Sequence, residues 1–388
     1  MSPLKRLLLI AAATSTVLAA ASASAASLDD PQRYVFVPNR ASADIAVIDS
    51  RTDRVVTRLP VGNVPHQVAI SEVTGKLIAS NTGDDTISIV DLSTLATKSL
   101  RLDHEPEHME LAPDGRLLAV GNIAAGTVSL VSLADEREIA RVSGLFEPHN
   151  LTFSPDGSLL YVANLGANHV SVVDVAKAKV IDEIKVADPI ALASAETEAD
   201  DEFQGIINVT RTPDGRLGFA AHGEGNRLAV IDLRTRELKK SIELGELPWR
   251  AYGTADGRYM LVPNNGDATL SVISTADLEV VATLPGAEDM TGVNTGWFET
   301  TALALSRAGR KAVVYDLVSM GKVGEIALPG TPETGVTTPD GRKLYVALSD
   351  VDQVAVIDIQ AQELIGTIDG VGDEPWGATM VGALNYCH

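Results

Sequence analysis

The repeating unit of this sequence is clearest at residues 161–174, which read Tyr161-Val162-Ala163-Asn164, a short loop, then Val170-Ser171-Val172-Val173-Asp174. In the second segment apolar residues alternate with polar or small ones, which is the period of a half-buried β-strand. Related segments occupy Tyr34 to Asp49, Leu77 to Asp91, Leu117 to Ser132, Leu217 to Asp232, Tyr259 to Ser274, Ala302 to Asp316 and Leu344 to Asp358. The chain therefore contains eight related units.

Two turn signals recur with the same period. Asp-Gly pairs lie between strand-like runs at Asp114, Asp156, Asp214, Asp256 and Asp340. Asp-Gly tolerates the positive φ of tight hairpins, so these pairs mark hairpin tips. Prolines recur upstream at Pro65, Pro106, Pro148, Pro248, Pro332 and Pro375, one or two repeats apart. Each repeat thus holds about four short strands, which is typical of a propeller blade.

The two ends of the repeat array predict how the ring closes. No inner strand precedes the first unit at Tyr34, whereas Trp376 to Gly382 reads as an inner strand with nothing after it. We therefore expect one all-β domain over residues 26–388, an eight-bladed β-propeller in which the C-terminal strand completes the N-terminal blade. Seven blades is the alternative, because the unit within residues 290–330 is the most degenerate.

Composition excludes several classes of partner. Of 388 residues, 31 are Lys or Arg and 52 are Asp or Glu, so the formal net charge is −21. This balance argues against nucleic-acid binding and against docking on anionic lipid. The single cysteine, Cys387, excludes an intrachain disulfide and a four-thiolate metal site.

The N-terminus reads as a secretory signal over residues 1–25. Lys5 and Arg6 precede a short apolar run, and Ala23-Ser24-Ala25 supplies small residues for cleavage. The apolar run is too short to span a membrane, and no other long apolar segment follows. We therefore expect a periplasmic or secreted protein with no membrane span.

The Tyr-Val-x-Asn pattern followed by Val-Ser-Val-Ile-Asp resembles the YVTN-type bacterial β-propeller repeat. Tyr161-Val162-Ala163-Asn164 is the closest copy, and the likeness covers essentially the whole mature chain. It departs at Ser306 and Leu348, which replace the asparagine. The resemblance implies the propeller fold and leaves activity open, since relatives include surface proteins and proteins linked to redox enzymes. In architecture alone the chain is also similar to eight-bladed haem-binding propellers.

Strand direction predicts which face carries chemistry. Because neighbouring strands are antiparallel, the proline-containing approaches to the inner strands lie on the face opposite the Asp-Gly tips. Aligning these approaches gives a ring at the channel mouth: His66, Glu107, His149, Ile207, Trp249, Glu333 and Trp376. His108 and Arg250 come one residue after the ring. His222 replaces a repeat asparagine, a residue whose expected role is structural.

These residues suggest a binding site. His66, His108 and His149 could hold Cu, Fe or Zn, or haem, with Glu107 as ligand or orienting group. Trp249 and Trp376 could stack a ligand, Arg250 could clamp a carboxylate, and His222 and Glu333 complete the ligand-binding set. Alternatively, each histidine hydrogen-bonds a neighbouring loop or faces the solvent channel. An acidic loop at residues 188–205 could cover the mouth, dock a partner or stay solvated.

Three functions remain open at this point. The first is an exported propeller that binds a small ligand or a periplasmic protein partner through its histidine-rich face. The second is a redox accessory protein or oxidoreductase that holds a metal or haem there. The third is a lactonase-like hydrolase with His149 or Glu107 as general base. The usual nucleophile, phosphate and dinucleotide motifs are missing, which favours a binding protein over an enzyme.

Overall fold

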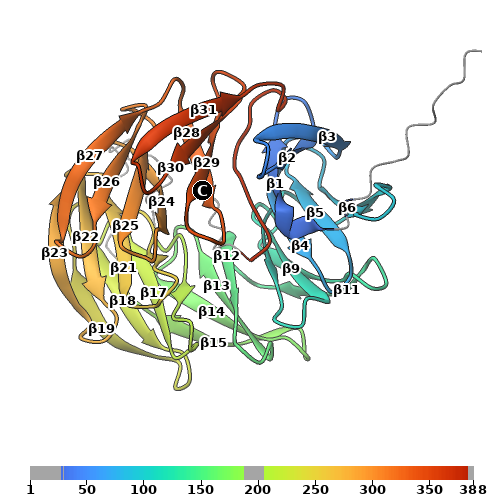
Figure 1. Cartoon of the computed structure of the whole chain (residues 1–388). Coiled ribbons are helices and arrows are strands. Elements are labelled where there is room, and N and C mark those ends of the chain that lie inside the picture. Colours follow the sequence, from blue (N-terminus) through green and yellow to red (C-terminus); the bar gives the residue numbers. More distant parts are fainter. Residues whose placement is uncertain (1–27, 29, 188–204, 383–388) are drawn as a thin grey trace, which may run out of the picture.

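The computed structural model describes residue 28 and the ranges 30–187 and 205–382. Its strands form eight antiparallel sheets arranged in a ring (Figure 1). A short 3-10 helix, η1 (Pro31–Arg33), precedes blade 1, which contains β1 (Tyr34–Asn39), β2 (Asp44–Asp49) and β3 (Arg54–Pro60). Blade 2 contains β4 (Pro65–Ser71), β5 (Lys76–Asn81), β6 (Thr86–Asp91) and β7 (Thr97–Arg101). Blade 3 contains β8 (Pro106–Leu111), β9 (Leu117–Asn122), β10 (Thr127–Ser132) and β11 (Arg137–Ser143).

The remaining blades follow the same plan. Blade 4 contains β12 (Pro148–Phe153), β13 (Leu159–Asn164), β14 (His169–Asp174) and β15 (Lys179–Lys185). Blade 5 contains β16 (Thr210–Arg211), β17 (Leu217–His222), β18 (Arg227–Asp232) and β19 (Glu237–Glu243). Blade 6 contains β20 (Tyr252–Gly253), β21 (Tyr259–Asn264), β22 (Thr269–Ser274) and β23 (Glu279–Pro285). Blade 7 contains β24 (Met290–Gly296), β25 (Thr301–Ser306), β26 (Lys311–Asp316) and β27 (Gly321–Ala327), and blade 8 contains β28 (Pro332–Thr337), β29 (Lys343–Leu348), β30 (Gln353–Asp358) and β31 (Glu363–Ile368).

The ring closes as the sequence predicts. Phe36 and Thr379 exchange two backbone hydrogen bonds of 2.9 Å, and Asn39 pairs with Pro375. The C-terminal segment therefore lies beside β1 and supplies the inner strand that blade 1 lacks (Figure 1). The degenerate unit of residues 290–330 forms a complete four-stranded blade, so the ring has eight blades and not seven.

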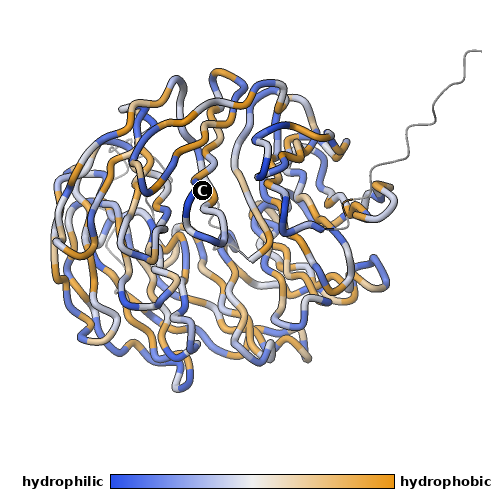
Figure 2. Tube along the Cα trace, viewed as in Figure 1, coloured by the Kyte–Doolittle hydropathy of each residue, from blue (hydrophilic) through white to orange (hydrophobic). Residues whose placement is uncertain are grey.

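The apolar core lies between neighbouring blades. Val170 and Val172 of blade 4, for example, pack in one cluster with Ile206 and Ala220 of blade 5. The second strand of blade 1, β2, is buried along its whole length, whereas the outer strand β3 alternates between exposed residues and half-buried or buried ones. Figure 2 shows that apolar and polar residues are interspersed along the strands. Each fully buried valine, leucine or isoleucine contributes about 1.5–3 kcal/mol to the stability of the fold. The packing between blades therefore supports the channel wall.

The repeat asparagines hold the loops on the histidine side, which confirms their expected structural role. Asn81 Nδ2 donates to Thr86 Oγ1 at 2.9 Å and to Ser88 Oγ at 3.0 Å. Asn122, Asn164 and Asn264 each bond in the same way to a serine seven positions later. At the opposite ends of the strands, the glycines of the Asp-Gly tips have positive φ, as these hairpins require.

Several predictions concern residues outside the described part. The signal peptide of residues 1–25 and Cys387 lie outside it, as does the acidic loop apart from Gly205. Leu28, three residues beyond the expected cleavage point, is buried and its N–H donates to the Leu92 carbonyl. Within the described ranges, the structure contains no helix with the length and apolar character needed to cross a membrane.

Candidate binding site at the channel mouth

A β-bulge at the start of the inner strands brings polar residues to the channel mouth. In β4, Pro65 pairs with Asn81 and the next pair is Val68 with Ala79, so His66 and Gln67 together oppose one residue of β5. The inner strands β8, β12 and β28 have the same irregularity after their prolines. A bulge of this kind bends the strand and re-aims its side chains. Consecutive residues such as Glu107 and His108 can therefore both reach one site.

The strand registers confirm the ring that the alignment predicts and add one member. In each blade, the last residue of the second strand pairs with one residue of the inner segment, and the ring residue comes directly after that paired residue. In blade 2, for example, Asn81 pairs with Pro65, and His66 follows. The ring positions are therefore His66, Glu107, His149, Ile207, Trp249, Thr291, Glu333 and Trp376. Thr291 is not predicted by the proline spacing, because its blade has Met290 where most of the other blades have proline. The pairing of Met290 with Ser306 identifies its place.

Three histidines surround one carboxylate oxygen. Glu107 Oε1 lies 3.5 Å from His66 Nε2, 3.5 Å from His108 Nδ1 and 3.9 Å from His149 Nε2. The ring centroids of His108 and His149 are 4.0 Å apart, and those of His66 and His108 are 5.3 Å apart. One donor atom each of His66, Glu107 and His108 lie within 4.8 Å of one another. The structure thus brings together all four residues predicted as metal ligands, which we call the histidine cluster.

Burial controls the charges in the histidine cluster. It raises the pKa of the Glu107 carboxyl to about 7; the charge of Glu105 adds to this effect, and Arg250 and Arg40 oppose it. Burial also lowers the pKa of His149 to about 3, an effect that Arg250 reinforces. His149 is therefore a neutral imidazole. Its Nδ1–H donates to the Ile207 carbonyl at 2.9 Å, which leaves the lone pair of Nε2 on the side of Glu107.

Three predicted ligand-binding residues flank the histidine cluster. Arg250 Nη2 lies 3.5 Å from His108 Nε2, and the Arg250 guanidinium is 5.7 Å from the centre of the Trp249 ring. Trp376 lies on the other side, with its ring centre 6.2 Å from that of His66. The Arg40 guanidinium stacks on the Trp376 ring at 4.1 Å, a distance typical of a cation–π contact.

Two other predicted residues have partners elsewhere. Glu333 accepts a hydrogen bond from Ser349, and its Oε2 lies 3.7 Å from Arg307 Nη1. His222 Nδ1 accepts from the Gly225 N–H at 2.9 Å, and its Nε2 bonds to Asn168. The described contacts of Glu333 and His222 are thus with neighbouring loops. This agrees with the alternative that such residues hydrogen-bond a loop and do not bind a ligand.

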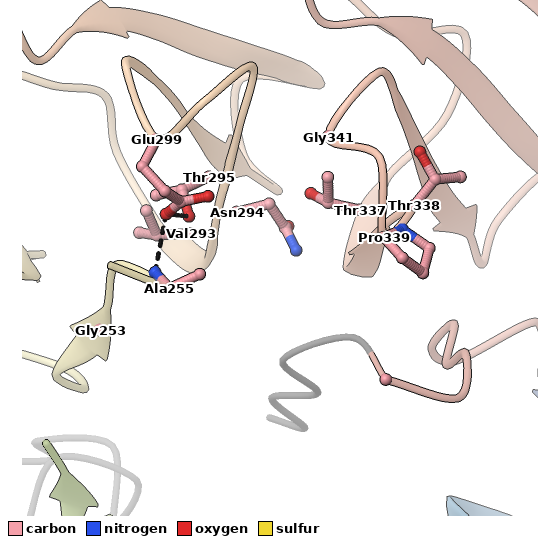
Figure 3. Close-up of a pocket in the computed structure, with 11 residues that line it drawn as sticks. Gly253, Ala255, Val293, Asn294, Thr295, Glu299, Thr337, Thr338, Pro339 and Gly341 are labelled. Carbon is pink, nitrogen blue, oxygen red and sulfur yellow. Dashed lines mark hydrogen bonds between the residues drawn. The ribbon is translucent and has the colours of Figure 1, made fainter. Parts of the chain in front are cut away.

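A chamber continues from the histidine cluster into the channel. Its volume is about 570 Å³, and its lining extends from His108 and Arg250 to Pro213 and Ala255 near the Asp-Gly tips. A smaller pocket of about 110 Å³ lies between blades 6, 7 and 8 (Figure 3). There the Glu299 carboxylate accepts hydrogen bonds from the Ala255 N–H and the Thr295 hydroxyl, so it links the tips of two blades.

The fold and the site define a β-propeller with a polar, histidine-rich channel mouth. The chain belongs to the YNCE-like beta-propeller family, whose sequence model matches residues 69–384. This match confirms the expected class of propeller, while the YVTN-type repeat itself stays a prediction. Comparison with curated proteins gave no match.

Solved structures of low sequence identity share the fold. Dihydro-heme d1 dehydrogenase NirN in complex with DHE is 17% identical with a TM-score of 0.74, covering 91% of this chain and 76% of that chain. Hydrazine synthase from Kuenenia stuttgartiensis is 21% identical with a TM-score of 0.58, covering 76% and 95%. A functionally unknown protein from Desulfotomaculum acetoxidans is 13% identical with a TM-score of 0.60, covering 90% and 98%. At these identities the likeness shows the fold alone.

Proposed function

We propose that this protein is an exported binding propeller that holds a transition-metal ion at the channel mouth through His66, Glu107 and His108, with His149 as a further ligand. The observation that carries the proposal is the arrangement of imidazole nitrogens around one Glu107 oxygen. Tetrahedral sites with bonds of about 2.0–2.2 Å place their donor atoms about 3.4 Å apart. The two separations of 3.5 Å from Glu107 agree with this geometry.

The surroundings of each histidine set its value as a ligand. The hydrogen bond from His149 to the Ile207 carbonyl fixes the tautomer and orients the ring, which is a common arrangement around metal-binding histidines. His108 is different, because Arg250 Nη2 faces its Nε2. If His108 coordinated a metal through Nδ1, its Nε2 would carry a proton. Two N–H donors would then face each other, so the Arg250 N–H would have to turn away. His66, Glu107 and His149 form the alternative set of ligands.

The donor types limit the metal and leave haem as the second candidate. Imidazole and carboxylate donors suit Zn, Cu and Fe better than Ca or Mg. The similar fold of NirN, whose structure is a complex with DHE, favours a haem-type ligand as the alternative at the same face. Trp376 and Trp249 beside the histidine cluster would supply flat apolar surface to either a haem or an organic ligand.

The test is the metal content and visible spectrum of the protein purified from the periplasm. We expect near-stoichiometric Zn, Cu or Fe, lost in His66→Ala and Glu107→Gln and retained in the control His104→Ala. His104 is a suitable control because it is exposed and pairs with Asp85 away from the histidine cluster. Comparing His108→Ala with His149→Ala identifies the third ligand. A metal-free protein that takes up neither added Zn²⁺, Cu²⁺ or Fe²⁺ nor haem would overturn the proposal.

Export is the second part of the proposal. It rests on the signal sequence of residues 1–25 and on Leu28, which already packs against the core of blades 1 and 2. We expect the intact mass of the periplasmic protein to correspond to a chain that begins at Ala26. A full-length chain that stays in the cytoplasm would contradict this part and leave metal binding unaffected.

A further inference from the structure

We infer that the chamber below the histidine cluster is a binding site for an organic carboxylate, held through Arg211 and Arg250. This site adjoins the proposed metal ligand His108 and extends from it along the channel wall. Its walls are the inner strands of blades 2 to 6, which contribute polar and apolar residues in alternation. The volume of about 570 Å³ lies in the range of small-molecule sites, roughly 300–1,000 Å³.

The charge of the chamber lining points to an anion. Its charged residues are Glu110, Arg211 and Arg250, so positive side chains outnumber negative ones. This contrasts with the whole chain, whose formal net charge is −21. A cationic chamber inside an acidic protein attracts an anionic ligand and disfavours a cationic one.

Arg211 is available to a ligand. It lies on the short inner strand β16 and is half-buried at the chamber wall. Within residues 30–187 and 205–382, no carboxylate oxygen lies within 4.0 Å of its guanidinium. Arginine presents a planar fork of N–H donors that matches a carboxylate with two parallel hydrogen bonds. The nearly fully buried Arg250 adds a second positive charge at the upper end, beside His108.

The remaining lining favours an organic anion over an inorganic ion. A chamber of about 570 Å³ is far larger than a small inorganic ion needs, and the apolar residues beside it, Leu151, Val209 and Met260, are buried in the cores between blades and hold its wall in place. The amides of Asn150 and Asn208 brace neighbouring inner strands, accepting from the Val209 N–H at 3.2 Å and donating to the Ala251 carbonyl at 3.1 Å. These bonds fix the strands that carry Arg211 and Arg250, which lowers the cost of ordering the site.

The experiment is calorimetric titration of the full mature chain after its metal has been removed with a chelator. Benzoate, succinate and citrate are the probes, benzamide is the neutral control and inorganic phosphate is the small-ion control. We expect at least one carboxylate to bind and to raise the thermal unfolding midpoint, and benzamide to do neither. Arg211→Gln should weaken binding about tenfold or more, because it removes the paired donors and their charge. Glu110→Gln should strengthen binding, since it removes the negative charge of the chamber.

Arg216→Gln is the matched control for Arg211→Gln. Arg216 is on the same blade and carries the same charge, but it is exposed at the Asp-Gly tip outside the chamber. Equal effects of the two variants, binding of benzamide as tight as benzoate, or phosphate binding as tight as every carboxylate would overturn the inference. So would the failure of all three carboxylates to bind. Because the titration uses metal-free protein, failure of the metal proposal would appear separately, in the metal analysis.

Discussion

At the scale of single residues, the repeat asparagine and the serine seven positions later form a recurrent hydrogen-bonded pair. Four blades carry this pair, for example Asn81 with Ser88. Blade 1 keeps the asparagine without the serine, because Ala46 follows Asn39, and Asn39 donates instead to Asp44 and to the Val371 carbonyl. Blade 5 has neither member, since His222 is at the asparagine position and Ala229 at the serine position. His222 instead bonds to Gly225 and Asn168. In blade 5 the imidazole thus takes its hydrogen bonds from neighbouring loops in place of the missing serine.

This pairing predicts a coupling between two substitutions in blade 5. His222→Asn should destabilise the protein by about 1–3 kcal/mol, because the hydrogen bonds of the imidazole are lost and Ala229 offers no hydroxyl. Adding Ala229→Ser should recover most of this loss, although Ala229→Ser alone should not stabilise the protein. Urea unfolding of the two single variants and the double variant measures the coupling energy. Strictly additive effects would contradict the pairing.

The residues that meet in the site could be predicted only in part. The proline spacing placed His66, Glu107 and His149 in one ring, because proline marks the same register position in most blades. The sequence pattern could not show that one Glu107 oxygen would face all three histidines. That contact depends on the bulge after each proline, where two residues of the inner strand oppose one residue of its neighbour. The alternation of apolar and polar residues in the sequence does not reveal such a bulge. Thr291 was missed for a related reason, because its blade lacks the proline.

At the scale of elements, the approach to most inner strands is strained in a regular way. The residue before the first paired residue of the inner strand has a positive φ at Val64, Glu105, Glu147, Leu247, Asp289 and Glu374, whereas Thr331 of blade 8 does not. Val64, at φ 50°, is the unusual member, because β-branched residues seldom adopt this conformation. The fold thus accepts backbone strain to turn the chain from the outer strand of one blade to the inner strand of the next.

Relief of this strain gives the second prediction on stability. Val64→Gly should raise the free energy of unfolding by up to about 1 kcal/mol. A left-handed backbone costs a non-glycine residue about 1–2 kcal/mol, and glycine avoids this cost. Part of the benefit is lost, because glycine also makes the unfolded chain more flexible. Val56→Gly is the matched control. It changes an exposed valine within strand β3, where φ is not positive, and should destabilise the protein. Urea unfolding measures both, and a loss at Val64 as large as that at Val56 would contradict the strain argument.

At the scale of the whole molecule, ring closure joins the two ends of the chain. The C-terminal segment forms backbone hydrogen bonds from Thr379 and Trp376 to β1, and Ala378 and Met380 pack into the core shared by blades 1 and 8. Lys343 of blade 8 also pairs with Asp53 of blade 1 at 2.7 Å. The channel mouth depends on this closure, because Trp376 is both a ring residue and part of the closing segment.

Closure predicts a graded response to changes at the C-terminus. A chain that ends at Glu374 loses the inner strand of blade 1 and exposes the edge of β1, so it should aggregate or unfold at a lower urea concentration. Thr379→Pro is the milder variant, because it removes the N–H that bonds to the Phe36 carbonyl and locally constrains the backbone but leaves the rest of the closing strand in place. A chain that ends at Gly382 keeps the paired segment and should unfold like the full mature chain. Gel filtration with light scattering and urea unfolding measure the series. If the chain that ends at Glu374 stays monomeric with an unchanged midpoint, the closing strand does not stabilise the ring, and the eight blades must be held together by blade-to-blade packing alone.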